Sequence, residues 1–196
     1  MKKIVIFASG SGSNAQRIIE FALNEPNSNF RVEAIFCNNP NAFVIHRAKK
    51  FNVPCYLFDR AQFNSMNQNS VLSKLQEINP SLIVLAGFLW LIPDFIVKSF
   101  PNKIINIHPA LLPKYGGKGM YGERVHQAVI EHQETESGIT IHYVSEYYDE
   151  GNIIAQYKCS VAANDSADSL AQKIHTLEHQ WFPVEINDLC KNIEVI

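Results

Sequence analysis

The chain has 196 residues, of which 46% are hydrophobic and 11% aromatic, enough to bury the core of one domain spanning residues 1–196. Seventeen Lys and Arg residues against 19 Asp and Glu give a formal net charge of −2, which supplies no positive field for a nucleic acid. The first apolar run is too short for a signal peptide or a membrane span, so we expect a cytoplasmic protein with small-molecule partners.

Short apolar runs alternate with helical patterns along the first half of the chain. The runs have the length of strands and cover residues 4–8, 32–36, 55–58, 82–86 and 104–107. This alternation predicts an α/β fold with a mostly parallel twisted sheet and helices on both faces. The first run leads through a glycine turn, residues 10–14, into a helix that carries Ile18, Ile19 and Leu23.

The second half begins with a glycine-rich stretch, Pro113 to Gly122, where we expect a mobile loop. Residues 139–144 and 153–161 then have the β-branched and aromatic content of strands, and the turn-rich residues 147–151 connect them. These two strands are expected to pair at or near one edge of the sheet. A helix follows, with Asp165 as a plausible N-cap, until Pro183 bends or interrupts it.

The four cysteines show no spacing typical of a zinc site and are interpreted as free thiols; they are Cys37, Cys55, Cys159 and Cys190.

Gly12, Ser13 and Asn14 stand where the first strand feeds a helix, so backbone N–H groups at the helix start can hold an anion, most naturally a phosphate. A tight turn with an ordinary helix cap is an equally good reading of this segment alone. A dinucleotide site is disfavoured because the third glycine of that motif is missing and the second strand ends without a carboxylate.

Asn106 and His108 lie two residues apart at the end of an apolar run, so both point to one face of a strand. Pro109 ends the strand, which places the pair at the edge where open α/β sheets bind ligands. A core histidine bonded to a backbone carbonyl is the alternative. Because Asn donates a hydrogen bond to an oxyanion and His exchanges protons near neutral pH, the pair suits acyl transfer to an amine.

Asp149 lies in a loop that could reach His108 and fix its tautomer. From the residues alone, a hairpin turn in which Gly151 takes a positive φ is the favoured explanation of this acidic loop.

Four segments together resemble the glycinamide ribonucleotide (GAR) formyltransferases, a family of folate-dependent enzymes, and the similarity runs nearly end to end. They are residues 10–14, 85–88, 106–113 and 149–151. The resemblance implies a Rossmann-like formyltransferase fold, with 10-formyltetrahydrofolate as co-substrate, GAR as acceptor and no metal. It also implies that Asn106 holds the formyl oxygen, that His108 shuttles protons, and that Asp149 tunes His108 and helps order a water.

The same resemblance assigns binding residues at both ends of the site. Gly12, Ser13 and Asn14 match the segment that holds the phosphate of GAR, and Glu178 matches a position that contacts its ribose. A solvated helix face is the alternative for Glu178. The folate-binding residues matched are Leu89, Trp90, Leu91 and Ile92, which receive the pterin, with Glu146, Tyr147, Tyr148 and Asp149 on the other side.

Three features depart from the family pattern. Trp90 stands where well-known members carry an arginine. Met66 stands where some members have a basic residue thought to meet the glutamate tail of the folate, so the resemblance transfers no tail contact to it. Residues 114–122 form a longer stretch than in many relatives and are expected to flank the GAR site.

The mechanism implied is direct attack of the GAR amine on the formyl carbon, with Asn106 and protonated His108 stabilising the oxyanion and no covalent enzyme intermediate.

Rivals within the superfamily act on a nucleotide sugar or on methionyl-tRNA, or hydrolyse formyltetrahydrofolate. The tRNA enzyme has a further C-terminal domain and the hydrolase an N-terminal regulatory module, and this chain is expected to lack both. A non-catalytic nucleotide-binding module is disfavoured by the intact Asn106, His108 and Asp149. The oligomeric state stays open between monomer and homodimer.

Overall fold

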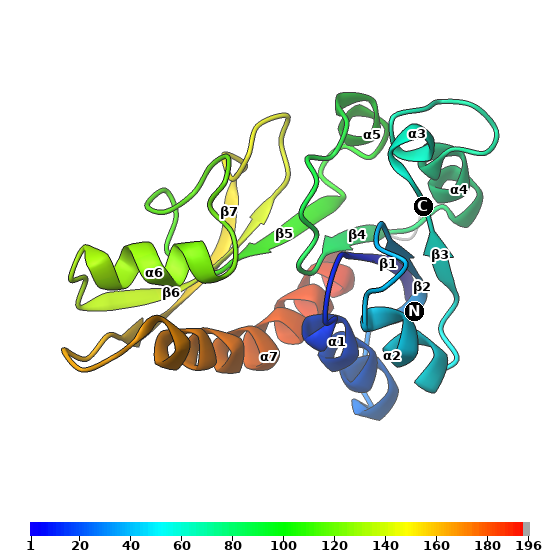
Figure 1. Ribbon diagram of the computed structural model, residues 1–196. Coiled ribbons are helices and arrows are strands. Elements are labelled where there is room, and N and C mark those ends of the chain that lie inside the picture. The colour runs from blue at the N-terminus through cyan, green and yellow to red at the C-terminus, as the bar shows by residue number, and fades with distance from the viewer. Residues whose placement is uncertain (194–196) are drawn as a thin grey trace.

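The computed structural model describes residues 1–193, so the last three residues of the predicted domain lie outside the described part. Its centre is a seven-stranded sheet with the order β3-β2-β1-β4-β5-β6-β7 (Figure 1). The strands are β1 (Lys2–Ala8), β2 (Phe30–Cys37), β3 (Cys55–Leu57), β4 (Leu82–Leu85), β5 (Ile104–His108), β6 (Glu136–Tyr143) and β7 (Ile153–Ser160). The first five pair in parallel, whereas β5 with β6 and β6 with β7 are antiparallel. The predicted fold class is confirmed.

Helices cover both faces of the sheet, because successive residues of the central strands point to opposite sides and both sides are buried. On β1, Ile4 and Ile6 belong to one core cluster, and Val5 and Phe7 belong to the other. The helices are α1 (Ser13–Asn24), α2 (Val44–Lys50), α3 (Arg60–Phe63), α4 (Val71–Ile78), α5 (Asp94–Ser99), α6 (Glu123–Glu131) and α7 (Ala167–Asn192). Residues of α1, α2 and α7 join the first cluster, and residues of α3, α4 and α5 join the second.

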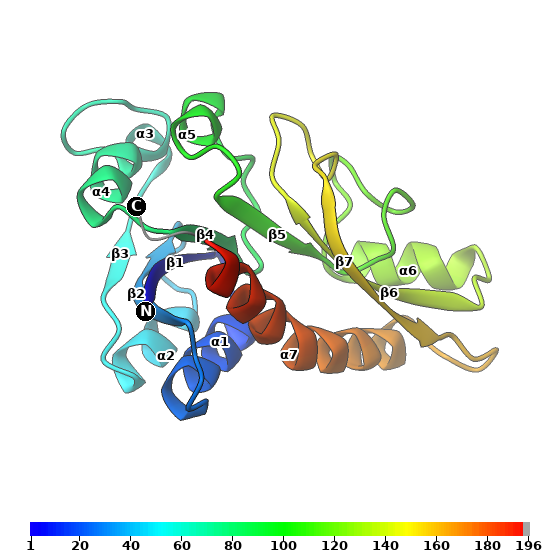
Figure 2. The ribbon, with the colours of Figure 1, turned by 180° about the vertical axis from the view of Figure 1, so that it is seen from behind.

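Helix α7 differs from its prediction at its N-cap. Its N-cap is Ser166, which forms a capping box with Ser169, and Asp165 instead accepts a hydrogen bond from the Ala162 N–H and pairs with Lys173. Pro183 does not interrupt the helix, which continues to Asn192 while its axis turns along the way (Figures 1 and 2).

The carboxyl ends of the parallel strands lie at one edge of the sheet, and the loops that leave them are joined. The Ser9 N–H donates to the Gly87 carbonyl at 3.0 Å, and the Leu89 N–H donates to the Ser9 hydroxyl at 3.1 Å. The loops after β1 and β4 therefore form one framework beside the end of β5.

All four cysteines are free, as predicted. Within residues 1–193, no helix has the length and apolar character needed to cross a membrane.

Candidate active site

A cavity of about 580 Å³ opens at this edge of the sheet. It is lined by the loops after β1, β4 and β5, by the loop between β6 and β7, and by the first half of α7. Every residue that the sequence singled out for catalysis or binding lines it, except Glu146. Glu146 lies with its Oε1 3.4 Å from the Lys98 Nζ, and its folate contact stays a prediction.

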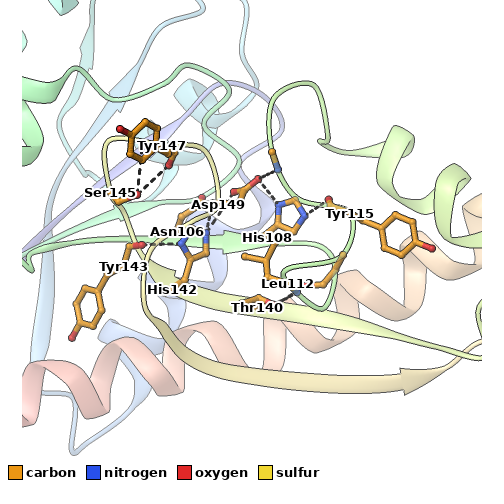
Figure 3. A network of polar contacts seen from close by, with 12 residues as sticks. Asn106, His108, Leu112, Tyr115, Thr140, His142, Tyr143, Ser145, Tyr147 and Asp149 are labelled. Atoms are coloured by element: carbon orange, nitrogen blue, oxygen red, sulfur yellow. Dashed lines mark hydrogen bonds and ion pairs between the residues drawn. The ribbon is translucent and has the colours of Figure 1, made fainter.

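His108 is the last residue of β5, and its side chain is 4% exposed. Its Nε2 lies 2.8 Å from the Tyr115 carbonyl oxygen (Figure 3). Since a carbonyl only accepts, Nε2 carries the proton in the neutral ring and Nδ1 is left free to accept one. That Nδ1 lies 3.5 Å from the Asp149 Oδ2. The imidazole is thus held in one tautomer, and its basic nitrogen lies beside a carboxylate.

Electrostatics separate the protonation states of these two residues. Burial lowers the pKa of His108 below 6.5, against the opposing effects of Asp149 and the Tyr115 carbonyl. Burial alone would raise the pKa of Asp149, but contact with His142, the charge on His108 and the Gly117 N–H outweigh burial and lower it. That N–H donates to the Asp149 Oδ2 at 2.9 Å. At neutral pH, a neutral base therefore lies beside an ionised carboxylate.

Asn106 is held by His142, a residue that the sequence reasoning missed. The antiparallel register places His142 on β6 opposite Asn106 on β5, and the Asn106 Nδ2 lies 3.1 Å from the His142 Nε2 (Figure 3). The His142 Nδ1 donates to the Tyr143 carbonyl at 2.8 Å, so its Nε2 accepts from Asn106. The Asp149 Oδ1 lies 3.6 Å from the same Nε2. The second amide hydrogen of Asn106 remains available to a ligand.

The loop at the other end of the cavity has the geometry of an anion site. Helix α1 begins at Ser13 without a side-chain cap, so its first N–H groups have no partner within the helix. Gly12 before it has φ 73°, and a Cβ at this position would overlap the Val44 side chain. Glycine is therefore required both by the backbone conformation and by the close approach of α2.

Glu178 lies buried against this loop, being 6% exposed, which rules out a solvated helix face. Its Oε2 accepts a hydrogen bond from the Asn14 Nδ2 at 2.9 Å and lies 3.0 Å from the His175 Nδ1. The hydrogen bond to Glu178 raises the pKa of His175. The Asn14 Oδ1 has no partner among the described residues. An unsatisfied buried acceptor beside uncapped N–H groups is typical of a polar ligand site.

The wall after β4 is apolar but exposed. Leu89 is 53% exposed and Leu91 38%, while Ile92 is buried. The ring of Trp90 packs against Phe58, Phe63 and Phe88 at centroid distances of 6.0, 5.6 and 6.3 Å. Large apolar side chains that line an open cavity suit a flat heterocycle.

Gly117 and residues 119–123 line the cavity, as expected for a loop that flanks a substrate, while the mobility of residues 113–122 stays a prediction. Within the described residues, no three His, Cys, Asp or Glu side chains are grouped to hold a metal ion, and the absence of metal chemistry also stays a prediction.

Comparisons with known proteins identify the family of the chain. Residues 2–186 match the family described as formyl transferase. Phosphoribosylglycinamide formyltransferase of Bacillus subtilis is 37% identical over 96% of this chain and 95% of its own length. The chloroplastic phosphoribosylglycinamide formyltransferase of Arabidopsis thaliana is 36% identical over 97% of this chain, which spans 66% of that protein. The crystal structure of glycinamide ribonucleotide transformylase 1 from Symbiobacterium toebii superposes with a TM-score of 0.88 at 31% identity, over 100% of this chain and 91% of that one.

Proposed function

This chain belongs to the formyl transferase family, and we propose that it is a phosphoribosylglycinamide formyltransferase, which transfers the formyl group of 10-formyltetrahydrofolate to the amine of GAR in purine biosynthesis. As a member of that family it is a formyltransferase that uses a folate-derived formyl donor and small-molecule substrates. The observation that carries the proposal is one cavity in which Asn106, His108 and Asp149 lie between an anion-binding loop and an apolar wall.

In the proposed reaction, the folate supplies the formyl group and the amine of GAR attacks its carbonyl carbon. Asn106 donates its free amide hydrogen to the formyl oxygen, where negative charge develops. His108 starts neutral and takes the proton of the attacking amine at Nδ1. The new C–N bond forms, the bond from the formyl carbon to the folate nitrogen breaks, and the proton passes to that nitrogen.

Asp149 stabilises the charged form of His108 during this transfer. Its carboxylate is ionised, and the Gly117 N–H holds its Oδ2, the oxygen that lies 3.5 Å from the histidine. Positive charge on the ring then adds to Asn106 in stabilising the formyl oxygen. No step requires a nucleophile of the enzyme or a metal.

Both substrates have suitable surfaces in the cavity. Gly12, Ser13 and Asn14 would hold the phosphate of GAR at the start of α1, and Glu178 would accept from its ribose hydroxyls. The folate-side residues are Leu89, Trp90, Leu91 and Ile92, with Tyr147 and Tyr148 from the loop between β6 and β7.

We also propose that residues 1–196 act as one formyltransferase domain, because strands from both halves of the chain share one sheet. The four free cysteines suit a reducing compartment, and we propose the cytoplasm. Size measurement by light scattering decides between a monomer and a homodimer.

The proposal is tested by following loss of the formyl group from 10-formyl-5,8-dideazafolate by absorbance, with and without GAR. Wild type should turn over when GAR is added, and His108→Ala should reduce kcat by about 100-fold or more while it still binds both ligands. Donor binding without GAR-dependent turnover would contradict the proposal and point to a nucleotide-sugar acceptor.

A further inference from the structure

The guanidinium of Arg60 lies over the indole ring of Trp90. The guanidinium carbon is 3.8 Å from the ring centroid, the separation of a stacked cation–π pair. Trp90 lines the cavity, and three phenylalanines fix the orientation of its ring from other sides. An exposed arginine is thus held in one place by a wall residue of the site.

The guanidinium of Arg60 has no acidic partner among residues 1–193. The neighbouring Asp59 is engaged elsewhere, since its Oδ1 caps α3 by accepting from the Gln62 N–H at 2.8 Å. Stacking uses the face of a guanidinium and leaves the N–H groups at its edge free. Those groups form a planar fork that matches a carboxylate in two parallel hydrogen bonds.

Other cations around the cavity are less suited to an anion at this wall. None of its lining residues within the described chain is a lysine or an arginine. Lys98 on α5 already pairs with Asp94 at 2.7 Å and with Glu146 at 3.4 Å. Arg124 belongs to α6, which lies at the opposite end of the molecule from α3 and α5 in both views (Figures 1 and 2). Met66 is 71% exposed and carries no charge.

We propose that Arg60, held by Trp90, binds the carboxylates of the glutamate tail of the folate where the apolar wall reaches the surface. The inference rests on the proposed function, which supplies a donor whose tail is anionic. The wall itself receives an uncharged ring, so the anionic end of the same molecule must find its cation beyond the wall. Arg60 is then a specificity-determining residue, and Trp90 also positions it.

The test compares two donors that differ in the tail alone, 10-formyl-5,8-dideazafolate and the methylamide of 10-formyl-5,8-dideazapteroate, in which an uncharged amide replaces the glutamate. Arg60→Gln should raise KM for the glutamate-bearing donor by about 5-fold, the upper end for an exposed ion pair, and leave kcat unchanged. KM for the donor without glutamate should not change. Added salt should reduce the wild-type preference for the tail, because the contact is exposed.

Arg31→Gln is the matched control, since Arg31 is an exposed arginine of β2 that pairs with Glu33 and does not line the cavity. It should change neither KM. An equal rise of KM for both donors in Arg60→Gln would show that the arginine merely braces Trp90, and no change with either donor would show that it contacts no ligand. Either result overturns the inference.

Titration of each donor in the absence of GAR separates this inference from the proposed function. Tighter wild-type binding of the glutamate-bearing donor, abolished in Arg60→Gln, supports the tail contact even if no formyl group reaches GAR. Equal binding of the two donors by wild type overturns the tail contact even if GAR is formylated.

Discussion

The position and the protonation state of the His108 side chain are set by protein groups around it, not by solvent. The Tyr115 carbonyl takes the proton on Nε2, and burial lowers the pKa of the ring. Asp149 opposes that shift from 3.5 Å away, so it limits how far the pKa falls. The balance yields a base that is neutral at pH 7 and that gains a stabilising partner once it is charged.

The pH dependence of kcat/KM, which reports the free enzyme, follows from this balance. The proposed mechanism needs neutral His108, so activity is lost as the pH falls through its pKa, and the acid limb should lie below pH 6.5. Asp149→Asn removes an effect that raises this pKa, so the limb should move to lower pH while kcat falls by about 100-fold. Asp188→Asn, at an exposed site on α7, serves as control. A limb that moved upward in Asp149→Asn would contradict the assignment of His108 as the base.

The meeting of Asn106, His108 and Asp149 in one cavity could be predicted, because strand periodicity fixes the first two and the resemblance supplies the third. The part played by His142 could not, since it depends on the register between β5 and β6, which single-strand patterns do not encode. The N-cap of α7 was placed one residue early. Asp165 and Ser166 are both good caps, and the geometry of the preceding turn selects Ser166.

Helix α2 supports the loop after β1, which is the proposed phosphate site. The Val44 N–H donates to the Gly10 carbonyl at 3.2 Å, and the Arg47 Nε donates to the Ser11 carbonyl at 2.9 Å. Both bonds use carbonyl oxygens of the loop. They therefore favour the conformation in which the N–H groups at the start of α1 stay unpaired and available to an anion.

Substituting Gly12 tests this packing. Gly12→Ala should lower the free energy of unfolding by about 1–3 kcal/mol, because the new Cβ meets Val44 and the positive φ is strained, and it should raise KM for GAR. Adding Val44→Ala should restore part of the stability by removing the overlap. Gly10→Ala is the control for stability, since its Cβ meets nothing within 4 Å. Urea denaturation measures all three, and a Gly12→Ala protein as stable as wild type would contradict the argument.

Elements were predictable in proportion to their length and regularity. The strands appeared as apolar runs, whereas α3 and α5 have four and six residues, too few to show a helical period. Helix α7 continues through Pro183 because Phe182 and Ile186 on either side are fully buried in the core. Packing of this kind offsets the hydrogen bond that proline removes, and local sequence does not reveal it.

At the scale of the whole molecule, two parts of the cavity wall that are distant in sequence are joined by a hydrogen bond. The Asn14 Nδ2 and the Glu178 Oε2 belong to residues 164 positions apart. The sequence suggested a role for each residue separately, but it could not reveal the hydrogen bond between them. That bond exists because α7 packs across α1 in the core beneath the sheet.

Glu178 should therefore matter for stability as well as for binding. Glu178→Ala leaves the Asn14 amide and His175 without their partner, and it should lower the free energy of unfolding by about 1–3 kcal/mol and raise KM for GAR. Glu178→Gln keeps an acceptor for Asn14 and should cost less. Glu77→Ala, at a carboxylate with 69% exposure, is the control. If thermal melting showed Glu178→Ala to be as stable as wild type, the contact would not contribute to the free energy of unfolding.

The contact between Asn14 and Glu178 also sets an order of events during synthesis. A chain emerging from the ribosome already contains Asn106, His108 and Asp149 when Glu178 has yet to be translated. Until α7 is made and docks, the buried Asn14 amide has no carboxylate partner and the wall of the cavity formed by that helix is missing. If Glu178 holds the acceptor as proposed, the nascent protein contains its proposed catalytic residues before it can complete the binding site for GAR.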